Sequence, residues 1–156
     1  MAIKEGEQAP SFALHDAHGN RVALENFRGK NVIVYFYPKD DTPGCTKEAC
    51  GFRDLWAEIQ RLDTVVLGIS PDGSTSHQKF AVKYQLPFTL LSDPDKTVMT
   101  AYGAYGEKVM YGKKSMGVIR SSVWVDPDGQ VKKHWQRVSR AEAHPAQILA
   151  AIKESL

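Results

Sequence analysis

Two short apolar segments separated by an amphipathic stretch constrain the fold more than any other feature of this sequence. Residues 31–37 and 64–69 are rich in β-branched and aromatic side chains, the pattern of strands that are buried on both faces. Between them apolar residues recur three and four positions apart, which predicts a helix with one stripe facing a sheet: Phe52, Leu55, Trp56, Ile59 and Leu62. Strand, helix and strand in this order form a βαβ unit, so we expect a parallel core.

The rest of the 156-residue chain continues the alternation of helices and strands, with no repeat and no linker, so we expect a single domain over residues 1–156. The predicted elements are a hairpin around Phe12 to Leu24, a helix at Ser74–Tyr84, a strand at Phe88–Leu91, a small helix near Lys96–Ala101, strands at Ile119–Val125 and Val131–Gln136, and a closing helix at Ala141–Lys153. This order suits a thioredoxin-like α/β fold, although periodicity alone leaves other α/β folds open.

Composition and charge argue against several classes of function. The chain has 20 Lys and Arg against 18 Asp and Glu, and a net charge of +2 is too weak to indicate nucleic acid. The pairs Lys113-Lys114 and Lys132-Lys133 are expected to be solvated. No apolar run approaches the length of a membrane span, and the first six residues lack the pattern of a signal peptide. We therefore expect a cytoplasmic protein, in which two cysteines would not form a permanent disulfide.

The segment from residue 38 to residue 50 runs from the end of a strand into the next helix, a place where open α/β sheets hold ligands. Pro43 and Gly44 end the strand, so Cys45 falls in the first helical turn, where free N–H groups favour a thiolate. A helix terminus contributes only about 0.3 to 1 kcal/mol, so a nearby cation is also needed. Arg120 is the candidate, although by sequence alone it would more readily be an exposed charge on a strand. The Thr42 hydroxyl and the loop N–H groups are further candidate donors to a substrate.

Cys50 follows Cys45 by five positions, which corresponds to about 7.5 Å of rise on a continuous helix and to different faces. Bridged cysteines need Cα atoms within about 7 Å, so a disulfide between these two would require the first turns of the helix to unwind. The alternative is that Cys50 simply packs between apolar neighbours, and Cys45 could in principle be a small buried apolar residue.

The spacing of Pro38, Thr42 and Cys45 resembles the active-site motif of the peroxiredoxins. The fuller segment from Tyr37 to Asp54 resembles the bacterioferritin comigratory protein branch, also called Q-type, an atypical two-cysteine group. The similarity extends over nearly the whole chain, through the segments at residues 6–12, 68–70 and 91–93 and through Arg120 before a hydrophobic strand. It implies a thioredoxin-like peroxiredoxin fold with a central mixed sheet, flanking helices and an N-terminal hairpin.

The resemblance also implies a function for individual residues. Cys45 would be the peroxidatic cysteine and Cys50 the resolving one, supported by Pro38, Thr42 and Arg120, with Glu48 near the site or organising Arg120. The implied activity is reduction of hydrogen peroxide and organic hydroperoxides, with thioredoxin as electron donor, no metal or organic cofactor, and a monomeric state. One departure is the sequence after Arg120, Ser121-Ser122-Val123-Trp124, where the family commonly has a Thr and a Phe.

Two other classes of function remain open from the residues themselves. The dithiol could hold zinc or sense redox state without turnover, but two cysteines fall short of four zinc ligands. A general dithiol oxidoreductase usually has a Cys-x-x-Cys motif, whereas the gap here is wider. The histidines are scattered, and none has ligand spacing from the cysteines: His15, His18, His77, His134 and His144. The tryptophans are expected to be core or surface aromatics.

Overall fold

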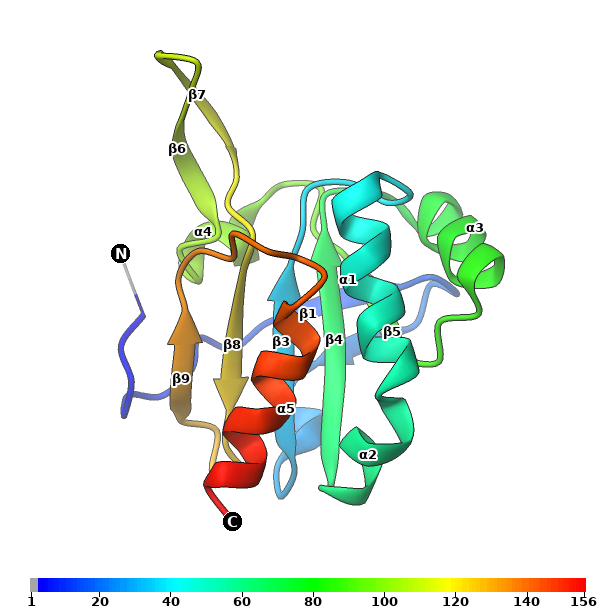
Figure 1. Cartoon of the computed structure of the whole chain (residues 1–156), viewed down its shortest axis with the longest axis vertical. Helices are drawn as coiled ribbons and strands as arrows, with labels where there is room; N and C mark the ends of the chain where they lie inside the picture. The colour runs from blue at the N-terminus through cyan, green and yellow to red at the C-terminus, as the bar shows by residue number, and fades with distance from the viewer. Residues whose placement is uncertain (1–2) are drawn as a thin grey trace.

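A seven-stranded mixed sheet lies at the centre of the computed structural model, which describes residues 3–156 (Figure 1). The strand order is β2-β1-β5-β4-β3-β8-β9. The bounds are Ala13–Asp16 (β1), Arg21–Ala23 (β2), Asn31–Phe36 (β3), Thr64–Ser70 (β4), Thr89–Ser92 (β5), Ser121–Val125 (β8) and Val131–Trp135 (β9). β3, β4 and β5 run parallel, whereas β1, β2, β8 and β9 pair in antiparallel fashion. The mixed sheet and the N-terminal hairpin predicted from the sequence are therefore confirmed.

β3 alternates its side chains between two hydrophobic clusters, one on each face of the sheet. Val34 and Phe36 belong to the first cluster, together with residues of the small helix α4 (Thr97–Ala101). Ile33 and Tyr35 belong to the second, beneath the larger helices. This period of two explains why residues 31–37 read as an unbroken apolar run: both faces of the strand are covered.

The helix predicted between β3 and β4 is in fact two helices, α1 (Pro43–Asp54) and α2 (Trp56–Arg61). The interruption is at Leu55, which has φ −101° and ψ 7°. Its N–H reaches the carbonyls of Gly51 and Phe52, both at 3.2 Å, so the last turn of α1 tightens and the chain changes direction. The apolar spacing survives this break, which is why the sequence pattern did not reveal it.

The remaining helices are α3 (Ser74–Tyr84), α4 (Thr97–Ala101) and α5 (His144–Glu154), with a short 3-10 turn η1 at Leu24–Phe27. α5 begins three residues later than predicted, with Pro145 in its first turn. Figure 1 shows α1 and α5 side by side in front of the sheet. A Cβ on Gly51 would lie 2.8 Å from the Pro145 ring, so this close approach of the two helices requires glycine.

A hairpin that the sequence did not predict projects from the body of the molecule (Figure 1). Its strands are β6 (Tyr105–Met110) and β7 (Lys113–Val118), and they form a separate two-stranded sheet. The turn consists of Tyr111 and Gly112, which both have positive φ, 54° and 76°, as a tight two-residue hairpin turn demands. The strand predicted at Ile119–Val125 begins only at Ser121, and Arg120 lies in the break between β7 and β8.

The expectations about membranes and export have different outcomes. Within residues 3–156, the structure contains no helix that is both long and apolar enough to cross a bilayer. Met1 and Ala2, which begin the segment considered for a signal peptide, lie outside the described residues.

Candidate functional site

The loop after β3 and the start of α1 place Cys45 at the carboxyl end of the parallel strands. Thr42 is the N-cap of α1, with an extended backbone, and its carbonyl accepts the first helical hydrogen bond from Thr46 N–H at 2.8 Å. Pro43 occupies the first helical position, where a missing N–H is tolerated. Cys45 is thus the third residue of the helix, as predicted, and only 1% of its surface is exposed.

Arg120 connects the break between β7 and β8 to two side chains of α1. Its Nη2 donates to Cys45 Sγ at 3.2 Å, and its Nη1 donates to Glu48 Oε1 at 2.7 Å. A Cβ on Gly44 would lie 3.2 Å from Nη2, so the absence of a side chain at residue 44 lets the guanidinium come this close. The structure therefore brings together Cys45, Arg120 and Glu48 from segments that are 75 positions apart in the sequence.

Glu48 is fully buried, and its ionisation state affects the net charge near the Cys45 sulfur. Burial raises the pKa of its carboxyl to about 7, although the charge and hydrogen bond of Arg120 act in the opposite direction. Its second oxygen, Oε2, is buried without a hydrogen-bond partner among the described residues. Burial also opposes the charge on Arg120, but Glu48 and Cys45 together hold the pKa of the guanidinium above its ordinary value. Arg120 thus stays cationic while its counter-charge on Glu48 is only partial near neutral pH.

Cys50 lies five residues, or about one and a half turns, further along the same helix. It is half-buried, and both cysteines are free thiols in this structure. The helix beyond it is fixed, because Gly51 packs on Pro145 and Phe52 is fully buried. A bond between the two sulfurs therefore requires unwinding of the turns before Gly51, as the spacing predicted.

Thr42 and Pro38 flank this arrangement. The Thr42 hydroxyl donates its proton to the Lys39 carbonyl at 2.8 Å, whereas the sequence predicted a donor aimed at a substrate. The oxygen of Thr42 remains as an acceptor. Pro38 is exposed directly after the β3 strand, where it begins the loop.

A family model for the AhpC/TSA family matches residues 5–134 of this chain. The chain belongs to the AhpC/TSA family. It is a peroxiredoxin similar to the bcp protein of Coxiella burnetii, with 47% identity over 97% of this chain and 100% of the relative. The peroxiredoxin Bcp of Bacillus subtilis is 41% identical over 99% of this chain and 98% of its own. A solved structure of the bacterioferritin comigratory protein of Xanthomonas campestris superimposes with a TM-score of 0.90 at 34% identity, covering 97% and 99% of the two chains.

These relatives establish the general function. The chain has the thioredoxin-like peroxiredoxin fold of the bacterioferritin comigratory, or Q-type, branch. It is a peroxidase, an oxidoreductase that reduces peroxides at a thiol and is regenerated by a thiol reductant. Across residues 3–156, no group of three or more His, Cys, Asp and Glu side chains is placed to hold a metal ion.

The peroxiredoxin also contains a buried network beneath the loop, which the sequence did not predict. Asp40 Oδ2 accepts a hydrogen bond from Ser76 Oγ at 2.8 Å and lies 2.7 Å from His77 Nδ1, and Tyr37 donates to Asp40 Oδ1. The Asp40 N–H donates to Asp72 Oδ2 at 2.7 Å. We call this set of contacts the loop clamp. One signal could have revealed it: parallel neighbouring strands bring the loop after β4 next to the loop after β3.

The departure from the family pattern after Arg120 also has a structural counterpart. Ser122 is fully buried, and its hydroxyl lies 2.8 Å from Nε2 of the buried His144. Burial lowers the pKa of His144 to about 4, so the ring is neutral at physiological pH. The small side chain at residue 122 makes room for this histidine against β8.

Proposed function

We propose that Cys45 is the peroxidatic cysteine of this peroxidase. The observation that carries the proposal is the Arg120 Nη2 donor 3.2 Å from a sulfur held in the first turn of a helix. Both features favour the thiolate, which attacks one peroxide oxygen. The sulfur–oxygen bond forms as the oxygen–oxygen bond breaks, and the departing oxygen takes a proton and leaves as water or an alcohol. Cys45 is left as a sulfenic acid.

The proposed roles of the neighbouring residues follow from their hydrogen-bonding capacity. Arg120 and the N–H groups at the start of α1 donate to the peroxide oxygens and stabilise the charge that develops on the leaving oxygen. The oxygen of Thr42 accepts the O–H of the substrate, because its own proton is engaged by Lys39. Pro38 shapes the loop, and Glu48 fixes the orientation of the Arg120 guanidinium.

The second step is resolution by Cys50. Its thiol attacks the sulfur of oxidised Cys45, a disulfide forms and water leaves. The position of both cysteines in one helix supports resolution within a single chain, with the first turns of α1 unwound. A cycle that closes within one chain needs no second subunit, so we propose a monomer that works as one domain over residues 1–156.

Thioredoxin is the proposed reductant of the disulfide, and both hydrogen peroxide and organic hydroperoxides are the proposed substrates. The comparable Xanthomonas campestris protein has alkyl peroxide reduction activity, which supports the wider substrate range. The two thiols are free in this structure. In the proposed cycle a disulfide replaces them, and a dithiol restores them by disulfide exchange. A reducing compartment provides such donors, so we propose that the protein works in the cytoplasm.

The test is NADPH oxidation in the presence of peroxide, thioredoxin and thioredoxin reductase. We expect Cys45→Ser to abolish turnover with every reductant. We expect Cys50→Ser to keep the first oxidation of Cys45 but to stall turnover with thioredoxin. Peroxide consumption by Cys45→Ser at the wild-type rate would refute the assignment of the nucleophile.

A further inference from the structure

The β6–β7 hairpin, residues 105–118, presents an apolar face that the fold does not cover. Five large apolar side chains of the described part of the chain are strongly exposed, and three of them lie in this hairpin: Val109 at 66%, Tyr111 at 98% and Met116 at 63%. Because Val109 pairs with Lys114 and Glu107 with Met116, the side chains of Val109 and Met116 lie on the same face. The same register places Glu107 and Lys114 on this face as well. We call the whole hairpin, residues 105–118 with Tyr111 at its tip, the arm.

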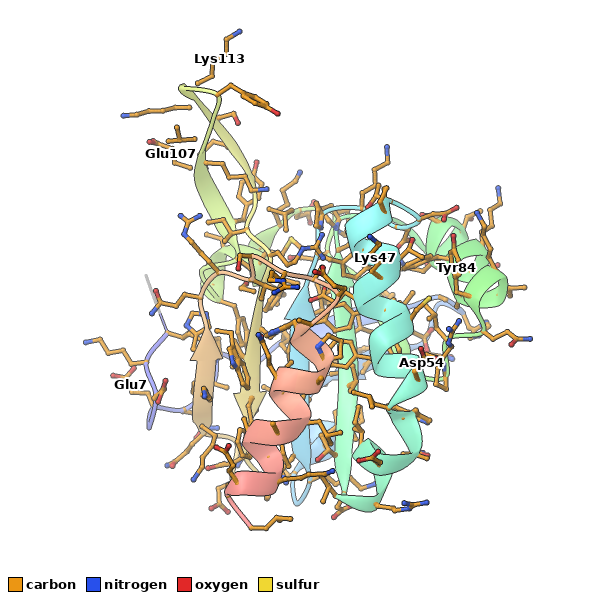
Figure 2. The ribbon with its side chains drawn as sticks, in the orientation of Figure 1. Glu7, Lys47, Asp54, Tyr84, Glu107 and Lys113 are labelled. Carbon is orange, nitrogen blue, oxygen red and sulfur yellow. The ribbon has the colours of Figure 1, made fainter. Side chains whose placement is uncertain are left out.

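An isolated two-stranded hairpin is at best marginally stable in water, and the arm pairs with no strand of the main sheet. Exposed apolar residues grouped on such a projection are characteristic of an interaction surface rather than of folding. Figure 2 shows Glu107 and Lys113 near the outer end of the arm, well away from the body of the molecule.

The arm is directly continuous with the reactive centre. β7 ends at Val118, and the chain then passes through Ile119 to Arg120, which contacts Cys45. Figure 1 shows the arm at the same end of the molecule as the start of α1. A protein that approaches the Cys45–Cys50 disulfide therefore comes up alongside the arm.

The charges on the arm and around the start of α1 indicate which kind of partner surface fits there. The arm contains Lys108, Lys113 and Lys114 against a single acid, Glu107, which is 3.7 Å from Lys114. Lys39 in the reactive loop and Lys47 on α1 are both exposed, and Figure 2 labels Lys47 near the start of this helix. The acidic Asp41 of this loop is paired with Lys83 at 2.8 Å. The surplus charge is positive, so an acidic surface is the complement.

We propose that the arm is the docking surface for the dithiol protein that regenerates this peroxidase, and that this reductant presents an acidic, partly apolar face to it. This inference rests on the proposed function, because it assumes that a disulfide between Cys45 and Cys50 is the substrate of the reductant. One partner thiolate attacks the disulfide to form a mixed disulfide, and the second partner thiol displaces it. Two electrons and two protons pass from the partner to Cys45 and Cys50.

The experiment compares two reductants on the same variants. The arm variant carries V109T, Y111N and M116Q, which keep strand and turn propensities while removing the apolar face. The matched control is V82Q, because Val82 on α3 is 78% exposed and apolar but lies outside the arm. Turnover is measured with the thioredoxin that sustains the wild-type enzyme, and separately with dithiothreitol, which needs no docking surface.

For the arm variant we expect the KM for thioredoxin to rise roughly tenfold, with dithiothreitol turnover and the rate of Cys45 oxidation unchanged. V82Q should match the wild type with both reductants. The double variant K113E/K114E should also have a higher KM for thioredoxin than the wild type. This increase should be larger at low salt than at high salt, because salt screens the exposed charges. An unchanged thioredoxin KM in the arm variant, or an equal loss with both reductants, would overturn the proposal.

Two further outcomes separate this inference from its alternatives. If sedimentation shows a wild-type dimer that the arm variant loses, while the thioredoxin KM is unchanged, the arm binds a second copy and the proposal is wrong. If the wild type consumes no peroxide even with dithiothreitol, the proposed function itself fails. Peroxide consumption that persists in every arm variant with an unaltered KM removes only the docking role.

Discussion

The loop at residues 38–42 and the first turns of α1 at residues 43–50 are adjacent in sequence but are held in different ways. The loop is fixed to its surroundings by side chains, since Asp40 is bound by Ser76 and His77 and Asp41 is bound by Lys83 and Tyr84. The start of α1 has no side-chain hydrogen bond at its N-cap and no acidic residue in its first turn. Beyond helical hydrogen bonds and packing, it is attached to the rest of the protein through Arg120.

This difference divides the site into a fixed side and a movable side. The fixed loop carries Thr42, which is proposed to accept the O–H of the peroxide, whereas the movable turns carry both cysteines and the N–H groups proposed to donate to the peroxide. We propose that oxidation of Cys45 alters its contact with Arg120, and so weakens the attachment of the movable side when unwinding has to begin. In this proposal the same residue pair favours attack in the reduced state and release in the oxidised state.

Removing Arg120 should have the largest effect, because it deletes the charged side chain that links the movable side to the rest of the site. For Arg120→Met we expect the rate of Cys45 oxidation by peroxide to fall about 10²- to 10³-fold. Stopped-flow tryptophan fluorescence measures this rate. Arg137→Met, which changes an exposed arginine after β9, is the control and should react at the wild-type rate.

Glu48 should make stability depend on pH. Burial raises the pKa of Glu48 from 4.5 to about 7, so the folded protein holds this proton more tightly than the unfolded chain does. The resulting stabilisation is complete below pH 4.5 and is lost as the pH rises to about 7. From this shift we expect the free energy of unfolding of the wild type, relative to Glu48→Gln, to fall by roughly 3 kcal/mol across that window.

The comparison with Glu48→Gln is needed because His144 acts in the opposite direction. Burial lowers the pKa of His144 to about 4, so its contribution to stability is lost as the pH falls towards that value. Urea titrations give the free energy of unfolding of both proteins at several pH values. The His144 contribution is common to both, so it cancels in their difference. Parallel stability curves would contradict the account of Glu48.

Weakening the loop clamp should lower stability and displace the loop at residues 38–42. In Asp40→Asn the buried carboxyl group that contacts Ser76 and His77 becomes an amide, which we expect to lower the free energy of unfolding by about 2 kcal/mol. Because Thr42 lies on the same loop, displacement of its oxygen should slow Cys45 oxidation about tenfold. Disulfide formation after oxidation should be unaffected. Asp41→Asn weakens the exposed contacts of the same loop with Lys83 and Tyr84, so it should have a smaller effect. An equal loss of peroxide rate in this variant would argue against a specific clamp.

Adding one methyl group to the movable side should have the smallest effect. In Gly44→Ala the new Cβ lies 3.2 Å from Arg120 Nη2 and pushes the guanidinium back by a few tenths of an ångström. We expect Cys45 oxidation to slow about threefold. Disulfide formation should slow too, because alanine makes the helix harder to unwind. Gly73→Ala, which meets no atom within 4 Å, should show neither change in rapid-quench measurements of both steps.

The sequence predicted the central sheet because β3 and β4 are covered on both faces, which leaves a continuous apolar run. It did not predict the arm, whose strands contain Gly106, Lys108 and Gly117 and bury little surface against the core. The one local signal for this hairpin is Gly112, which suits a tight turn with positive φ. The break at Leu55 was missed because the apolar spacing continues through it into α2.

The candidate site was predictable where its residues are close in sequence. Cys45 follows from the Pro43-Gly44 boundary, and the need for unwinding follows from the gap to Cys50. The loop clamp depends on Asp40 and His77, which are 37 positions apart, and His77 has no sequence neighbour that marks it. The resemblance implied that Glu48 lies near the site or organises Arg120, and the structure pairs these two side chains. The complete burial of Glu48 was not predicted, because it depends on where the break after β7 places the arginine.

The most direct test of the proposed cycle is intact mass with a free-thiol count, before and after one equivalent of hydrogen peroxide. The account predicts that the wild type loses two thiols and two hydrogens, while Cys50→Ser gains one oxygen as a sulfenic acid at Cys45. Two thiols that survive peroxide unchanged in the wild type would contradict it.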